Sequence, residues 1–102
     1  MDPIKDSTIL IGKKDTKSYV LAVITVLNQG SNKILLKARG KAISTAVDVA
    51  EMARNKFAKE LKVDDIKIST EELKNEDGSN VRVSAIEISL SKHESWRLFS
   101  IY

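Results

Sequence analysis

The sequence predicts an α+β fold in which a four-stranded mixed sheet carries two helices on one face, in the order β-α-β-α-β-β. Two short apolar runs are each followed by a basic turn and a helical pattern, and the second half of the chain changes to a period-two alternation around a turn signal. With 102 residues, the chain has the size of one domain. The expected architecture is therefore a two-layer sandwich with an extended β-hairpin arm.

The first strand and helix are expected near the N-terminus. Residues 8–12 are expected to form a strand, since they contain the continuous apolar run Ile9-Leu10-Ile11, which is typical of a strand buried on both faces. Residues 13–17 form a polar turn, with Asp15 or Ser18 as the N-cap of the next helix, and Gly30 is suited to end it. The apolar residues at helical spacing between residues 19 and 28 are Tyr19, Val20, Val23, Ile24 and Leu27.

A second strand, residues 33–38, leads into a longer helix that begins near Ala42. The strand–helix–strand order implies a parallel pair of strands joined by a right-handed crossover. Helical spacing predicts one apolar stripe along this second helix, formed by Ile43, Ala46, Val47, Ala50, Ala53, Phe57 and Leu61.

The remainder of the domain alternates with period two, as a β-hairpin does. Ile66 and Ile68 alternate with polar residues, residues 84–90 do the same, and Asp77-Gly78 between them is a turn signal. The ends of this hairpin are expected to reach past the core. The apolar phase flips near residues 85–86, which either a β-bulge or a change of exposed face explains.

The two ends of the chain are expected to differ from the domain between them. Residues 1–7 are expected to be flexible, residues 8–92 to form the domain, and residues 93–102 to form an aromatic C-terminal extension. Its large apolar side chains favour docking on the domain or on a partner. They are Trp96, Leu98, Phe99, Ile101 and Tyr102.

Charge is unevenly distributed along the chain. The formal net charge is +3, but residues 1–60 carry nine Lys, two Arg and six acids, a net of +5, whereas residues 61–102 carry a net of −2. This asymmetry indicates a nucleic-acid or acidic-membrane partner. The absence of Cys excludes disulfides and thiolate metal sites. Because no signal core and no apolar stretch of roughly 20 residues occurs, a cytoplasmic location without membrane contact is expected.

Basic residues gather where each predicted strand turns into a helix. Lys13 and Lys14 follow the first strand, and Lys37, Arg39 and Lys41 flank the end of the second. Because parallel strands end on the same edge of a sheet, these side chains are expected to converge beside two helix N-termini. Such an edge suits phosphate, and above all a polyanion. The alternative is that these lysines are ordinary solvated surface.

Enzymatic activity finds little support in the sequence. An enzyme acting on phosphorylated substrates needs catalytic groups, but only one histidine, His93, is present, and no metal-ligand spacing or Ser–His–acid set occurs. Asp48 and Glu51 lie one helical turn apart, but paired acids on a charged helix face are ordinary solvent-exposed residues and do not indicate a catalytic pair. We therefore expect no catalysis, no metal and no cofactor. An assembly protein acting through its aromatic extension is a further alternative.

A series of short segments resembles the Alba proteins of archaeal chromatin, in order and with near-identical spacing over about residues 8–92. Each segment alone is weak evidence for the resemblance, whereas the whole series is specific. The segments are Ile11-Gly12-Lys13-Lys14, Tyr19-Val20-Leu21-Ala22, Leu27-Asn28-Gln29-Gly30, Lys37-Ala38-Arg39-Gly40-Lys41-Ala42-Ile43-Ser44, Ala46-Val47-Asp48, Arg54-Asn55-Lys56-Phe57 and Val83-Ser84-Ala85-Ile86-Glu87-Ile88.

The resemblance implies a chromosome-associated homodimer that binds duplex DNA and RNA with little sequence preference and coats or compacts chromatin. Lys13 matches a reversible acetylation site of some members, and Arg39 matches a DNA-contacting arginine. Lys41 stands where many members have Arg, so it keeps the charge but loses the two-pronged donor. Phe57 matches an aromatic of dimer–dimer contacts along DNA, and from the residues alone core packing explains it equally well.

The hairpin arm departs from the family pattern. The family arm reaches toward the minor groove and usually carries basic residues, whereas residues 71–82 hold four acids against two cations. Because a narrow minor groove repels acids, this arm is expected not to enter it deeply, and mainly RNA binding is the alternative function. The candidate contacts are Lys13, Lys14, Lys37, Arg39 and Lys41 on the turns, and Lys74, Asn80 and Arg82 on the arm.

Overall fold

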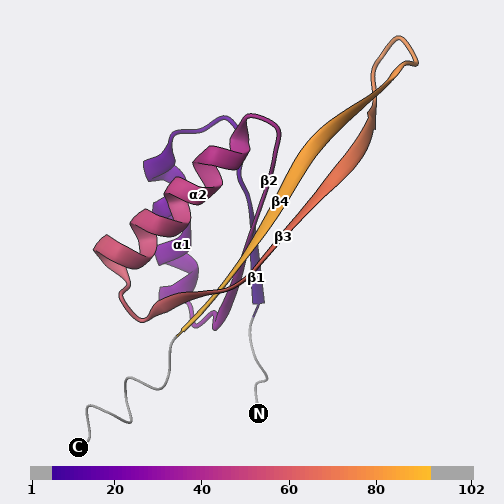
Figure 1. The fold of residues 1–102 in the computed structure, drawn as a ribbon. Helices are drawn as coiled ribbons and strands as arrows, with labels where there is room; N and C mark the ends of the chain where they lie inside the picture. Colours follow the sequence, from indigo (N-terminus) through magenta and orange to yellow (C-terminus); the bar gives the residue numbers. More distant parts are fainter. Residues whose placement is uncertain (1–5, 93–102) are drawn as a thin grey trace, which may run out of the picture.

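A computed structural model, which describes residues 6–92, has the predicted α+β architecture (Figure 1). The sheet has the strand order β1-β2-β4-β3, and both helices cover one of its faces. The elements are β1 (Asp6–Leu10), α1 (Thr16–Asn28), β2 (Lys33–Arg39), α2 (Ala42–Met52), the π-helical turn η1 (Ala53–Phe57), β3 (Leu61–Lys74) and β4 (Asn80–Lys92).

The sheet is mixed, as predicted. β1 and β2 pair in parallel, from Asp6 opposite Lys33 to Leu10 opposite Lys37, whereas β4 runs antiparallel to both β2 and β3. Because β1 and β2 point the same way, the turns that leave them lie on the same edge of the sheet. β1 begins at Asp6, so two residues assigned to the N-terminal segment belong to the first strand.

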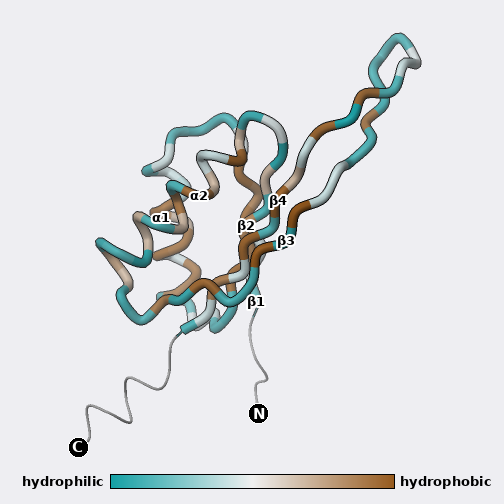
Figure 2. Tube along the Cα trace, in the orientation of Figure 1, coloured by the Kyte–Doolittle hydropathy of each residue, from teal (hydrophilic) through white to brown (hydrophobic). Residues whose placement is uncertain are grey.

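The core lies between the sheet and the two helices, where apolar segments of both layers face each other (Figure 2). The loops at the β1 and β2 carboxyl ends and the tip of the hairpin are hydrophilic. The largest fully buried side chains are Ile34, Leu36, Leu90, Val23 and Val49. Removing this apolar surface from water is the main term that holds the two layers together.

Local signals set the limits of α1. Asp15, one of the two predicted caps, accepts a hydrogen bond from the Ser18 N–H at 2.9 Å, so the helix begins at Thr16, three residues earlier than its apolar pattern indicates. Gly30 has a φ of +101° and follows the helix, where the N–H groups of Gly30 and Ser31 bond to the carbonyls of Leu27 and Val26. This pair of bonds is the Schellman arrangement that glycine favours.

The end of the second helix differs from the prediction. The residues of η1 form a π-helical turn, closed by a 2.7 Å bond from the Ala58 N–H to the Ala53 carbonyl, and Leu61 is the first residue of β3. A π turn holds more residues than an α turn, so Phe57 rotates away from the apolar stripe and is 62% exposed. The prediction that Phe57 packs in the core is therefore wrong. Val47, also predicted to lie on the apolar stripe of α2, is half exposed, and Val49 is buried instead.

The hairpin arm extends well beyond the two layers (Figure 1). β3 and β4 stay paired out to Lys74 opposite Asn80, and Gly78, at a φ of +90°, closes the predicted turn. The register shift lies in β3, between Val63 and Asp65, and not at residues 85–86. The phase flip is thus a change of exposed face between the arm and the sheet. The aromatic extension, residues 93–102, lies outside the described residues.

Candidate nucleic-acid interface

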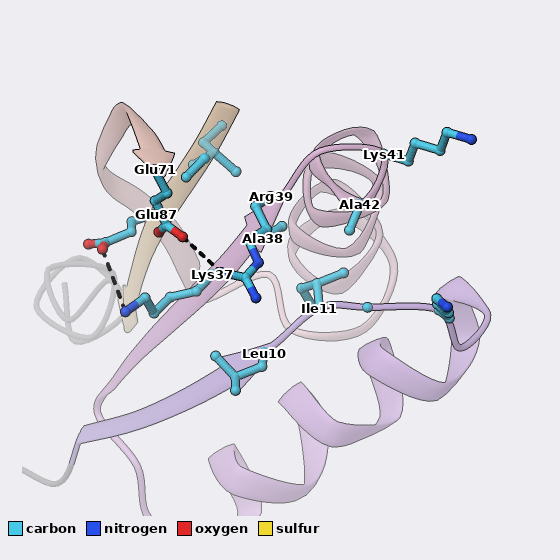
Figure 3. Close-up of a pocket in the computed structure, with 13 residues that line it drawn as sticks. Leu10, Ile11, Lys37, Ala38, Arg39, Lys41, Ala42, Glu71 and Glu87 are labelled. Atoms are coloured by element: carbon cyan, nitrogen blue, oxygen red, sulfur yellow. Dashed lines mark hydrogen bonds and ion pairs between the residues drawn. The ribbon is translucent and has the colours of Figure 1, made fainter. Parts of the chain in front are cut away.

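A depression of about 770 Å³ lies at the sheet edge where β1 and β2 end (Figure 3). Four of the predicted cations line it: Lys13 from the first turn, and Lys37, Arg39 and Lys41 from β2 and the second turn. Apolar residues of β1, β2 and β4 also line it, together with Glu71 and Glu87. Two turns that are separate in the sequence are therefore one site in space. We call Lys13, Lys14, Lys37, Arg39 and Lys41 the basic edge.

The core holds the first turn of the basic edge. Ile11 is buried and donates its N–H to the carbonyl of Lys37 at 2.8 Å, which ties this turn to the end of β2. The hydroxyl of the buried Tyr19 accepts the N–H groups of Gly12 at 2.8 Å and Lys14 at 3.0 Å. The backbone is thus fixed, whereas the side chains of Lys13 and Lys14 lie in solvent. Lys14 does not line the depression but adjoins it in sequence.

The second turn depends on Gly40. This residue has a φ of +59°, donates its N–H to the carbonyl of Ser84 on β4 at 2.8 Å, and accepts the N–H of Ile43 at 3.2 Å. It therefore joins the start of α2 to the sheet. Lys41 is the N-cap residue of α2 and gives the helix no side-chain cap. Its side chain points away from Arg39 and Glu71 (Figure 3).

The two helix N-termini at this edge differ. The first-turn N–H groups of α2 have no side-chain partner at the cap, so they can attract an anion. At α1, the Asp15 carboxylate already accepts from Ser18, and these hydrogen bonds lower the pKa of Asp15. Of the two helix N-termini, the one of α2 is therefore the better placed to attract an anion.

Two cations of the basic edge are paired with carboxylates. Arg39 Nη1 lies 2.9 Å from Glu71 Oε1, and Lys37 Nζ lies 3.8 Å from Glu87 Oε2. All four side chains are about half exposed, and exposed ion pairs of this kind contribute roughly 0–1 kcal/mol. A phosphate can therefore replace either carboxylate at small cost. Among the residues that the structure describes, Lys13, Lys14 and Lys41 have no ion pair.

The arm residues form a separate group. Lys74 and Asn80 face each other at the end of the paired arm, and Arg82 lies 3.6 Å from Glu72. Asn80 is five positions beyond Ala85, the partner of Arg39, so it lies roughly 17 Å along the strand from the basic edge. The structure therefore does not bring Lys74, Asn80 and Arg82 into the depression. Phe57 lies at the opposite end of α2 from Lys41.

A second, smaller depression lies between the start of α2 and the hairpin. Its volume is about 430 Å³, and its apolar lining comes from Ile43, Ile68 and Ile86. Ile68 is 80% exposed, and Ile66, on the same face of β3, is 55% exposed. The alternating sequence pattern predicted the strand β3, but it did not indicate that the apolar side chains of this strand would extend past the part of the sheet that the helices cover. Exposed apolar side chains that gather in this way are a common feature of interaction surfaces.

Residues 6–92 show neither a metal-binding cluster nor a membrane-spanning helix. No group of three or more His, Asp or Glu side chains is placed there to hold a metal ion. No helix among those residues is long and apolar enough to cross a membrane. His93 lies outside the described part of the chain.

The fold and the site define a class of small α+β domains that present a basic sheet edge beside a long β-hairpin. The chain belongs to the Alba family, whose sequence pattern matches residues 7–70. It is 53% identical over 88 residues to the DNA/RNA-binding protein Alba of Thermoplasma acidophilum, covering 86% of this chain and 98% of that one. Identity to the protein of the same name from Methanocella arvoryzae is 47% over 88 residues, covering 86% of this chain and 92% of the other.

Solved structures agree with this assignment. Alba from Thermoplasma volcanium superposes with a TM-score of 0.79 at 53% identity, covering 83% of this chain and 99% of that one. ALBA1 from Trypanosoma brucei shares the fold alone, with a TM-score of 0.69 at 23% identity, covering 95% of this chain and 77% of the other. The relatives carry the names of binding proteins, and membership of this family agrees with the expectation that the chain is not an enzyme.

Proposed function

We propose that this protein binds duplex DNA and structured RNA with little sequence preference, through phosphate contacts made by the basic edge. The observation that carries the proposal is the convergence of Lys13, Arg39 and Lys41 on one depression, beside the uncapped start of α2. Cations on rigid turns contact the sugar–phosphate backbone, which carries no direct sequence information. The names of the Thermoplasma and Methanocella relatives, DNA/RNA-binding proteins, support the same conclusion.

We further propose that two copies form the binding unit. Ile43 and Ile68 line the depression between α2 and the hairpin, and Ile66 lies on the same face of β3; this apolar group is too exposed for a single subunit, since Ile68 alone is 80% exposed. A second copy, packed on the same surface by a two-fold axis, would bury it and double the basic edge. Two basic edges on one particle would then engage the duplex together.

The biological role that follows is the coating or compaction of chromosomal DNA in the cytoplasm. Phe57, exposed at the far end of α2, is available for dimer–dimer contacts along the duplex. Lys13, exposed on the first turn, is available for acetylation, which would remove one charge from the basic edge. Neither role requires a change in the fold.

Mainly RNA binding is the second candidate, and the hairpin arm favours it. Glu71, Glu72, Glu76 and Asp77 outnumber the two cations of the arm, so the arm carries a net charge of −2. A narrow DNA minor groove has an enhanced negative potential, whereas the minor groove of A-form RNA is wide and shallow. Competition between a DNA duplex and a structured RNA at one salt concentration distinguishes the two.

Salt dependence tests the proposal directly. If the four cations that line the depression act in each of two subunits, they would release the counterions of about eight phosphates. The logarithm of affinity should then fall against that of salt concentration with a slope of roughly −7. A slope near −2 would contradict the basic edge as the contact surface. Binding of one sequence only, with others rejected, would contradict a backbone-reading mode.

A further inference from the structure

We propose that Glu71 is an internal competitor for Arg39 and thereby sets the nucleic-acid affinity of the basic edge. The proposal rests on the proposed function, since it concerns the same surface. Glu71 Oε1 accepts a hydrogen bond from Arg39 Nη1 at 2.9 Å, where a phosphate oxygen would otherwise accept (Figure 3). Carboxylate and phosphate are the two anions that an arginine guanidinium recognises best, so one occupies the site of the other.

The placement of Glu71 follows from the sheet. Arg39 ends β2 opposite Ala85 of β4, and Glu71 lies on β3, the next strand along, two positions beyond the partner of Ala85. The ion pair therefore reaches across β4 on the face that the helices leave open. Ala85 has only a methyl group, which leaves room for two long side chains to meet above it.

The same arrangement recurs at the other arginines of the described residues. Arg82 lies 3.6 Å from Glu72, and Arg54 lies 2.8 Å from Glu51, whereas no described carboxylate pairs with Lys13, Lys14 or Lys41. On the basic edge, the carboxylates therefore compete for Arg39 and, at the longer distance of 3.8 Å, for Lys37, whereas Lys13, Lys14 and Lys41 on the turns are unpaired among the described residues. Arg39 contributes its full charge only when a phosphate displaces Glu71, and a polyanion already held by the lysines would bring that phosphate close.

The ion pair between Arg39 and Glu71 is weak enough for a phosphate to displace the carboxylate. The two side chains are 56% and 42% exposed, and a single hydrogen bond leaves other guanidinium N–H donors free. Exposed pairs contribute at most about 1 kcal/mol, so a phosphate can break this one. Glu71 would then lie beside the phosphate as an uncompensated negative charge and would continue to oppose binding.

The test compares Glu71→Gln with a remote substitution of equal charge, Glu60→Gln, in the full-length protein. Glu60 precedes Leu61, which pairs with Lys92, seven positions from Ala85 and roughly 23 Å away along β4. Binding of a short DNA duplex is measured by fluorescence anisotropy at near-physiological salt, and circular dichroism checks that each variant is folded.

We expect E71Q to tighten binding about fivefold, the equivalent of about 1 kcal/mol, and E60Q to change it less than about twofold. E71Q should also steepen the salt slope by up to about 0.9 per subunit, or about 1.8 for the proposed dimer, because Arg39 of each subunit then exchanges its counterion more completely. In an Arg39→Gln background, the added E71Q substitution should give a clearly smaller gain than in the wild-type protein, because only the direct repulsion between Glu71 and phosphate is then removed.

Three results would overturn the inference. These are an E71Q gain no larger than that of E60Q, a gain that persists in full without Arg39, or weaker binding by E71Q, which would make Glu71 a positioning residue. Failure of the wild-type protein to bind any duplex would instead refute the proposed function itself, so the two failures are distinguishable.

Discussion

The hydroxyl of Tyr19 accepts hydrogen bonds from two backbone N–H groups of the first basic turn, Gly12 at 2.8 Å and Lys14 at 3.0 Å. Tyr19 lies in the first turns of α1, and its ring is buried in the core. A single side chain therefore joins the packing of the domain to the backbone that carries Lys13 and Lys14. The turn is fixed from below, which leaves its cations free to face solvent.

Removal of that hydroxyl should loosen the turn without opening a cavity. In Tyr19→Phe the ring stays in the core, but the N–H groups of Gly12 and Lys14 lose their acceptor. We expect the free energy of unfolding, measured by urea denaturation, to fall by about 1–2 kcal/mol. Duplex affinity should fall as well, because the backbone under Lys13 and Lys14 is no longer held. Unchanged stability would show that water replaces the hydroxyl fully.

Charge reversal at the basic edge should weaken binding without sequence selectivity. Lys14→Glu and Arg39→Glu each replace a phosphate contact with a repulsion, and we expect a loss of about tenfold or more in affinity for every duplex of equal length. The matched control is Lys59→Glu, which makes the same change between η1 and β3, at the other end of the domain. Selective loss for one sequence would point to base contacts instead.

Features encoded by neighbouring residues could be predicted from the sequence. The Asp15 cap, the glycine after α1 and the Asp77-Gly78 turn each depend on a few adjacent positions, and all occur where expected. The convergence of Lys13 and Arg39 was predictable as well, because parallel strands joined by a helix end on one edge. The order of strands and helices, which the sequence pattern predicts, was therefore enough to predict where the basic edge lies.

Features that depend on register could not be predicted. The ion pair between Arg39 and Glu71 joins residues 32 positions apart and requires the alignment of β2, β4 and β3 together. The π turn is set by how α2 meets β3, so the 3.6-residue periodicity wrongly placed Phe57 in the core. The exposure of Ile68 likewise depends on how far the helices cover the sheet.

A single polar substitution in the apolar surface of the hairpin should separate the proposed dimer. Ile68 is 80% exposed, so Ile68→Asp leaves the core of one subunit intact but places a charge in the interface. We expect a folded monomer by analytical ultracentrifugation and a salt slope reduced to roughly −3.6, since four phosphates are engaged in place of eight.

The control for this experiment is Leu21→Asp. Leu21 is 66% exposed on α1 and does not line the depression between α2 and the hairpin. The variant should keep the oligomeric state and salt slope of the wild-type protein. Dissociation by L21D but not by I68D would move the interface to the face formed by α1.

The backbone conformation of Gly40 offers a test of the second turn. Its φ is +59°, and a Cβ built there meets nothing within 4 Å, so the cost of Gly40→Ala is one of backbone strain alone. We expect a loss of about 1 kcal/mol in the free energy of unfolding. Gly40→Asn should lose less, because asparagine tolerates the left-handed region better than alanine does. Equal losses would indicate that the side chain, and not the backbone, causes the effect.

The Asp15 cap predicts how stability varies with pH. Hydrogen bonds from Ser18 lower the pKa of this carboxyl in the folded state below its ordinary value of 3.8. Between the two values the unfolded chain binds more protons than the folded one, so stability rises with pH there. The contribution of the charged cap to stability is therefore complete above the ordinary pKa and is lost as pH falls through the lowered pKa of the folded state.

The variant Asp15→Asn tests this, because it keeps a good capping residue without the charge. In urea denaturation, the stability advantage of the wild-type protein over D15N should be constant near neutral pH and shrink in strong acid. An advantage that widened on acidification would contradict the assignment of Asp15 as a charged cap.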